Sequence, residues 1–259
     1  DTLPSAYEES GNVQELTLIL KESTQDLSLE LHYSVFEDRD VIVRSAKLIN
    51  TGKDAVKLLR LMSLQLDYEN AGYVMSTFNG KWAGEMYRHD TQVEAGKFVN
   101  ASYTGTSSNR ANPFVMLSLP ETTEDYGVCY GFNLIYSGNH YEALEVNGYG
   151  KSRFVMGINP QSFCFIIEPG SVFETPEAVM TFSDRGFNGM SFAMHDFVRE
   201  CIVRGEWKHK LRPVLLNSWE AAYFDINESR LLKLAKAGKE VGIELFVMDD
   251  GWFGNRNDD

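Results

Sequence analysis

The stretch Leu27-Ser28-Leu29-Glu30-Leu31-His32-Tyr33-Ser34-Val35 alternates strictly, with apolar residues at the odd positions and polar residues at the even ones. Successive side chains of a β-strand point to opposite faces of a sheet. The pattern therefore predicts a half-buried strand that has one core face and one solvent face.

Further short apolar runs follow up to about residue 180, and turn signals such as Thr51-Gly52 and Pro169-Gly170 separate them. Many short strands without intervening helices are typical of an antiparallel sandwich, and the length of this region predicts a large one. The other predicted strands are Val41–Asn50, Lys57–Tyr68, Phe114–Leu119, Val128–Tyr136, Phe154–Ile158 and Phe163–Ile167.

The pattern changes near residue 190. Met190, Met194, Phe197 and Cys201 recur at helical spacing, which predicts a helix over about 190–204. Arg212-Pro213 then marks a boundary. We therefore expect residues 190–212 to be a linker helix after the sandwich.

The last part of the chain predicts a strand, a helix and a second strand. Val214–Trp219 and Ile243–Met248 are buried-type strands, and Glu228–Val241 is an amphipathic helix that Gly242 ends in a left-handed cap. Two parallel strands need more partners and a second covering layer, most simply those of a (β/α)8 barrel. The predicted fold is therefore mainly β. It comprises a large antiparallel β-supersandwich over 1–189, expected to lack its own N-terminal part, then the linker helix, and the first strands of a truncated barrel over 213–259.

Composition excludes several classes of function. The 259 residues carry a net charge of −13 with scattered Lys and Arg, which argues against a nucleic-acid partner. No apolar run approaches the roughly 18 residues of a membrane span, and the N-terminus lacks a signal-peptide pattern. The three separated cysteines, Cys129, Cys164 and Cys201, predict free thiols in a reducing, cytoplasmic compartment.

No motif predicts a cofactor or a metal. Gly148–Ser152 resembles the end of a phosphate loop, but the first glycine of that loop would fall at Glu145. Gly189–Ala193 resembles a nucleophile elbow but lacks its second glycine, so Ser191 is expected to begin a helix. The five histidines include no HExxH pair, so we expect no metal site.

Two clusters end the last two predicted strands, namely Trp219-Glu220-Ala221 and Asp249-Asp250-Gly251-Trp252. Side chains at the carboxyl ends of barrel strands build the active site, and carboxylates there accept strong hydrogen bonds from sugar hydroxyls. The structural alternative is a helix N-cap, which explains one Asp but not two followed by Gly-Trp. We therefore expect Asp249, Asp250 and Trp219 to bind substrate.

Trp82 lies in Asn79–Arg88, which is expected to be a loop between strands. The structural interpretation is that Trp82 closes the end of the sandwich. The functional interpretation is that its indole stacks on a sugar, because the ring face packs on the CH face of a sugar while the N–H stays available to hydroxyls.

These motifs carry a family resemblance. The segments Arg212–Ala221, Tyr223-Phe224-Asp225 and Gly242–Gly254 resemble the bacterial α-galactosidases of glycoside hydrolase family 36. Individually weaker matches continue upstream and cover essentially the whole chain in order. These are Gly80-Lys81-Trp82, Gly105-Thr106-Ser107-Ser108, Asn112-Pro113-Phe114, Tyr136-Ser137-Gly138-Asn139 and Thr175-Pro176-Glu177.

The resemblance implies a supersandwich, a (β/α)8 barrel and a C-terminal β domain, and hydrolysis of α-galactosides such as melibiose and raffinose with retention and without a metal. It implies that Asp249 and Asp250 hold galactose hydroxyls, that Trp219 lines the same subsite, and that Trp82 reaches a substrate pocket, in tetrameric members across a subunit interface. It also implies that the nucleophile and the acid/base lie on later barrel strands. This segment is therefore expected to be inactive alone, and its parent to be a homo-oligomer.

The chain departs from the family at two places. An Arg-Glu-Arg run is common after the loop Trp, where this chain has Ala83-Gly84-Glu85-Met86, and a His is common where Asn109 stands. Two alternatives stay open: a relative that acts on another α-glycoside, and a non-catalytic carbohydrate-binding sandwich.

Overall fold

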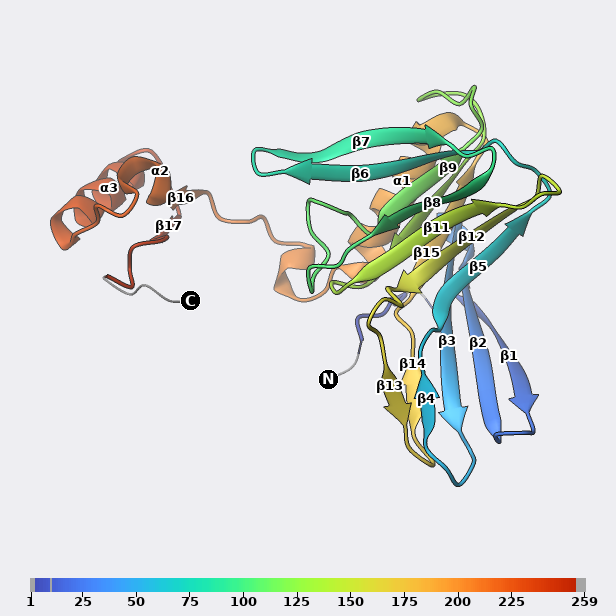
Figure 1. Ribbon diagram of the computed structural model, residues 1–259. Helices are drawn as coiled ribbons and strands as arrows, with labels where there is room; N and C mark the ends of the chain where they lie inside the picture. The colour runs from blue at the N-terminus through green and yellow to red at the C-terminus, as the bar shows by residue number, and fades with distance from the viewer. Residues whose placement is uncertain (1–2, 10, 255–259) are drawn as a thin grey trace. The chain divides into compact units, whose positions relative to one another are not determined.

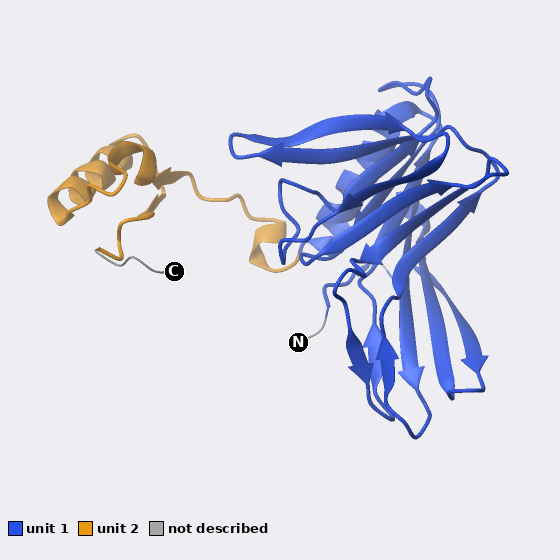
Figure 2. Cartoon of the chain, in the orientation of Figure 1, with its two compact units in different colours: residues 1–203 blue, residues 204–259 orange. Residues whose placement is uncertain are grey.

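The computed structural model describes residues 3–9 and 11–254. The chain divides into two compact units, Asp1–Val203 and Arg204–Asp259 (Figure 2). The division falls inside the segment 190–212. Within the described residues, no helix has both the length and the apolar character needed to cross a membrane.

The first unit consists of antiparallel sheets, as the alternating pattern predicts (Figure 1). The large sheet has the order β1 (Gln14–Glu22), β2 (Leu27–Phe36), β3 (Val41–Asn50), β15 (Ala178–Ser183), β10 (Cys129–Leu134), β9 (Phe114–Ser118), β6 (Val74–Lys81) and β7 (Gly84–Gln92), with β14 (Val172–Glu174) also paired to β3. The second sheet has the order β5 (Met62–Tyr68), β12 (Ser152–Ile158), β11 (His140–Val146) and β8 (Gly96–Ala101), and β13 (Phe165–Ile167) pairs with β4 (Val56–Leu58). The predicted antiparallel, mainly β fold is confirmed.

The main core lies between the two large sheets. Because side chains alternate along a strand, Val115 and Leu117 of β9 face this core, while Met116 between them faces the other side of the sheet. Phe132 of β10 meets Phe154 of β12 across the core with ring centroids 4.4 Å apart. Both phenylalanine side chains are fully buried.

A second core lies on the other face of the large sheet, under helix α1 (Gly186–Phe197), which continues into the π-helical segment η2 (Val198–Ile202). The buried side chains of α1 and η2 are those of Phe187, Met190, Met194, Phe197 and Cys201. The helix begins four residues before the predicted 190, because Phe187 belongs to the same apolar stripe. It packs against β10 and β15, and Figure 1 shows it behind the large sheet.

Two sequence-based element predictions in the sandwich were wrong. Lys57–Tyr68 is not one strand. Its first part belongs to β4, which pairs with β13 up to Leu58, and its last part is β5, which pairs with β12 from Met62. Asn79–Arg88 is not a loop but the turn end of the β6–β7 hairpin, in which Lys81 pairs with Gly84.

The second unit contains η3 (Glu206–Lys208), β16 (Leu215–Asn217), α2 (Trp219–Ala222), α3 (Glu228–Glu240) and β17 (Leu245–Val247). Asn227 caps α3 by accepting a hydrogen bond from the Arg230 backbone, and Gly242 follows the helix with a φ of 88°. Strands β16 and β17 pair in parallel. Each is shorter than predicted, because the flanking residues turn into helices and loops.

Candidate functional site

The first group of predicted site residues lies at the carboxyl ends of β16 and β17. The parallel register pairs Asn217 with Val247, and the Ser218 backbone N–H donates to the Val247 carbonyl at 3.0 Å. The segments that leave the two strands therefore start side by side. Asn217 Nδ2 donates to Asp249 Oδ2 at 2.6 Å, which joins the two strand ends directly.

Asp249 and Asp250 have different environments. The half-buried Asp249 accepts the bond from Asn217, and its backbone N–H donates to Oγ of the fully buried Ser218 at 3.2 Å. Asp250 is exposed, and its backbone N–H donates to Asp249 Oδ1 at 2.8 Å. Among the described residues no donor contacts the Asp250 carboxylate, so it stays available to a ligand.

Trp219 does not end a strand, as the sequence predicted, but is the first residue of α2. Its backbone N–H donates to Asn217 Oδ1 at 2.8 Å, and its ring meets Tyr223 and Phe224 edge-on at 5.2 and 4.9 Å between centroids. Asn217 therefore uses both side-chain groups at this junction: the amide N–H holds Asp249, and the carbonyl holds the start of α2.

Trp82 belongs to the first unit and lies at the turn of the β6–β7 hairpin. Its side chain is 84% exposed, so it does not close the end of the sandwich. The neighbouring Ala83 has a φ of 56°, which is uncommon for a residue with a Cβ. At Gly80 an added Cβ would lie 2.4 Å from the Gly84 carbonyl oxygen, so this narrow hairpin requires glycine there.

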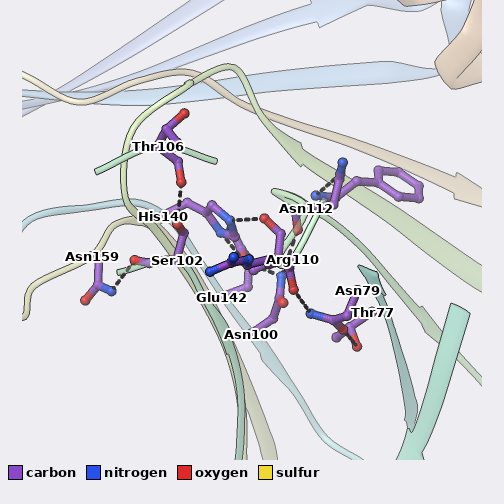
Figure 3. Close-up of polar contacts among 12 residues, drawn as sticks. Thr77, Asn79, Asn100, Ser102, Thr106, Arg110, Asn112, His140, Glu142 and Asn159 are labelled. Atoms are coloured by element: carbon purple, nitrogen blue, oxygen red, sulfur yellow. Dashed lines mark hydrogen bonds and ion pairs between the residues drawn. The ribbon is translucent and has the colours of Figure 1, made fainter. Parts of the chain in front are cut away.

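Four of the five sandwich motifs meet at the loop of residues 102–113, between β8 and β9. The Gly105 backbone N–H donates to Asn139 Oδ1 at 2.8 Å, and Thr106 Oγ1 donates to the Ser137 carbonyl at 2.9 Å. Asn79 Nδ2 on β6 donates to the Arg110 carbonyl at 2.7 Å. The motif segments around 80, 105, 112 and 137 thus form one polar cluster, part of which Figure 3 shows.

A buried charged pair lies beneath this loop (Figure 3). His140 and Glu142, both on β11 and both fully buried, join through Nδ1 and Oε2 at 2.8 Å. His140 Nε2 lies 2.8 Å from the Ala111 carbonyl oxygen, and Asn100 Nδ2 donates to Glu142 Oε2 at 2.8 Å. Because a carbonyl only accepts, Nε2 carries a proton, and a second proton lies between Nδ1 and the carboxylate.

The pKa values of this pair follow from burial and contact. Burial opposes charge on His140, but the hydrogen bond to Glu142, the charge of that carboxylate and the Ala111 carbonyl raise the pKa of His140 above its ordinary value. Burial also raises the pKa of Glu142, and the bonds from His140 and Asn100 oppose that rise. Proton sharing leaves the pair without net charge.

Sequence reasoning missed Asn217 and the His140–Glu142 pair. Asn217 ends an apolar run two residues before the predicted site residue Trp219, so its place at a strand end was a usable signal. His140 and Glu142 are two apart and share a strand face, but their burial depends on distant residues. Among the described residues, no group of three or more His, Cys, Asp or Glu side chains could hold a metal ion.

Comparison with known proteins gives a consistent result. Residues 1–168 match the glycosyl hydrolase family 36 N-terminal domain, and residues 172–259 match the melibiase family. Alpha-galactosidase AgaA of Geobacillus stearothermophilus is 40% identical over 99% of this chain, and alpha-galactosidase Mel36A of Lactobacillus acidophilus is 41% identical over the same share. The chain spans 35% of the length of each of these relatives.

Solved structures agree. The alpha-galactosidase of Lactobacillus brevis matches with a TM-score of 0.95 and 41% identity, over 99% of this chain and 35% of that one. A variant of the Geobacillus stearothermophilus enzyme in complex with stachyose matches with a TM-score of 0.94 and 40% identity, over 99% of this chain and 36% of that one. A family model that covers most of the chain, and structural agreement along nearly all of it, show that this protein belongs to glycoside hydrolase family 36.

Proposed function

We propose that this chain is the N-terminal third of a longer retaining α-galactosidase. In this assignment residues 1–189 are the β-supersandwich, 190–212 connect the domains, and 213–259 open the catalytic (β/α)8 barrel. The parallel pairing of β16 with β17 and the intervening helix α3 support the start of a barrel.

The junction between Asn217 and Asp249 carries the proposal. It brings the carboxyl ends of two neighbouring parallel strands together, and substrate-binding side chains of such barrels come from these ends. Asp249 is oriented by its bonds to Asn217 and Ser218, while the carboxylate of Asp250 is exposed. In the proposal both carboxylates accept hydrogen bonds from galactose hydroxyls, and Trp219 lines the same subsite.

Trp82 is the proposed contact of the sandwich domain with substrate. Its indole has a large exposed face, and covering this face with a sugar or with another subunit is energetically favourable. Because the Trp82 indole is largely exposed among the described residues, a homo-oligomer in which a neighbouring subunit uses this indole is part of the proposal. The free thiols Cys129, Cys164 and Cys201 support a cytoplasmic location.

The proposed substrates are terminal α-galactosides of the melibiose and raffinose type. Structures of the Geobacillus stearothermophilus relative contain raffinose and stachyose. Retention uses two carboxyl groups about 5 Å apart, one as nucleophile and one as acid/base. We propose that both lie outside these 259 residues.

The test is hydrolysis by the full-length protein. It should release galactose from raffinose and from an aryl α-galactoside, and should leave aryl β-galactosides and aryl α-glucosides intact. Residues 1–259 alone should show no steady turnover. Preference for an α-glucoside would indicate a relative with another substrate, and galactose binding by residues 1–203 without turnover in any form would indicate a binding module.

A further inference from the structure

We propose that His140 and Glu142 are a positioning pair, which fixes the loop of residues 102–113 against the β6–β7 hairpin and thereby sets how tightly the full-length enzyme binds its sugar. The inference rests on the proposed function, because it acts through the hairpin that carries Trp82. Neither side chain needs to touch the substrate. Both are fully buried, so their influence must pass through neighbouring residues.

The pair and its partner Asn100 bind the loop through two backbone carbonyls. His140 Nε2 bonds the Ala111 carbonyl at 2.8 Å. Asn100 Nδ2 donates both to Glu142 Oε2 and to the Asn112 carbonyl, each at 2.8 Å. Two consecutive loop carbonyls are therefore held by one hydrogen-bonded network. Leaving a buried carbonyl without a hydrogen-bond partner is unfavourable, so this network defines the local backbone conformation.

The loop is in turn hydrogen-bonded to the β6–β7 hairpin. The Asn112 backbone N–H donates to the Phe78 carbonyl at 3.1 Å, and Asn79 Nδ2 donates to the Arg110 carbonyl at 2.7 Å. Asn112 Nδ2 also donates to Met86 Sδ at 3.2 Å. Residues 110–112 thus contact both strands of the hairpin, three or four residues from its turn at Trp82.

The start of β11 also contacts the first residues of the loop. Asn139, which precedes His140, accepts the bond from the Gly105 backbone, and the Ser102 backbone N–H donates to the His140 carbonyl at 3.1 Å. The start of β11 therefore holds the loop near both of its ends. A shift of the pair would move residues 102–113 as a unit.

The chemistry of the pair supports positioning rather than simple stabilisation. A buried ion pair is weak evidence for stability, because apolar residues of similar volume often stabilise a core as well or better. Hydrogen bonds are directional, so the pair instead holds the groups that it bonds, such as the Ala111 carbonyl, in one geometry. Glu142→Gln tests this, since the substitution conserves volume but removes the carboxylate charge and places an amide N–H₂ at one of the two oxygen positions that lie 3.0 and 2.8 Å from His140 Nδ1.

The chain offers a matched control. His32 and Glu30 are also two residues apart on one strand and form a pair at 3.3 Å, but both are partly exposed and belong to β2. Glu30→Gln therefore removes the same charge from the same kind of pair outside the network.

In the full-length enzyme we expect Glu142→Gln to raise KM for raffinose about tenfold with kcat within about twofold, because the lost interaction acts on binding. Glu30→Gln should match wild type. In a double-mutant cycle, Glu142→Gln should add little to Trp82→Ala, because both act at the hairpin. If Glu142→Gln does not fold, Asn79→Ala breaks the contact between loop and hairpin directly and should raise KM in the same way.

Amide hydrogen exchange separates this inference from the proposed function, because it requires no activity. Exchange within residues 102–113 should be faster in Glu142→Gln than in wild type, while exchange in β2 and β3 stays unchanged. Unchanged exchange in the loop, a normal KM, or a loss of kcat alone would overturn the positioning role, and strictly additive effects with Trp82→Ala would overturn the route through the hairpin. Faster loop exchange in a protein without galactosidase activity would uphold the positioning of the loop and reject the proposed function.

Discussion

Replacing Asp250 by Ala in the full-length enzyme should reduce kcat/KM without affecting stability. The carboxylate is exposed and has no donor among the described residues, so its removal breaks no internal bond. In the proposed galactoside complex it accepts two hydrogen bonds from sugar hydroxyls. Hydrogen bonds to a charged group contribute about 1.5–3 kcal/mol each, which gives a total of about 3–6 kcal/mol. At 1.4 kcal/mol per factor of ten, kcat/KM should fall about 10²- to 10⁴-fold.

The assay is steady-state hydrolysis of an aryl α-galactoside, together with urea unfolding of the same sample. Glu240→Ala is the matched control, because Glu240 is an exposed carboxylate of the same unit at the end of α3. A loss of kcat/KM below about threefold in Asp250→Ala would refute the assigned role, since even one charged hydrogen bond contributes more. A lowered urea midpoint would refute the view that this carboxylate has no structural role.

Three further predictions concern the sandwich. Phe132→Ala should lower the free energy of unfolding by about 3–5 kcal/mol in urea titrations, because the ring is fully buried against Phe154; a loss below 1 kcal/mol would contradict this core. Gly131→Val should lower it by about 1–3 kcal/mol, since an added Cβ would lie 2.6 Å from Met190 Sδ under α1; an unchanged urea midpoint would show that the helix is not tightly packed there. The pKa of His140 is raised in the folded protein, so its protonation stabilises the fold fully below the unfolded pKa of about 6.5, and this stabilisation is lost as the pH rises through the folded pKa. The free energy of unfolding of wild type should therefore exceed that of His140→Asn by less and less above about pH 6.5. A difference in stability that grows with pH would contradict a raised pKa.

The sequence predicted those elements whose burial is periodic. Strand β2 was recognised by strict alternation, and α1 by apolar residues at helical spacing. Strand β7 was missed because Glu85–Gln92 is largely polar and exposed. This edge strand is held by ladder hydrogen bonds to β6 rather than by burial, so it leaves no apolar pattern.

The strand-end residues Asp249 and Asp250 could be predicted from the sequence, whereas the buried network around His140 could not. Parallel strands bring their carboxyl ends to one edge, so the neighbourhood of Asp249 and Asp250 followed from local patterns alone. The network around His140 joins β8, β11 and the loop between β8 and β9, and its contacts reach 42 residues along the chain. Such contacts depend on the arrangement of strands in the sheet, which periodicity does not encode.

The position of β15 has a consequence for synthesis of the chain on the ribosome. This strand is the last to be made in the large sheet, yet it lies between β3 and β10. It pairs Val179 with Val43 and Met180 with Phe132, so the β1–β3 segment and the β10–β9–β6–β7 segment stay separate until residue 183 has left the exit tunnel. Until then two strand edges are open to other nascent chains. A translational pause before residue 183 should therefore expose the protein to misassembly, whereas a pause after α1 should not.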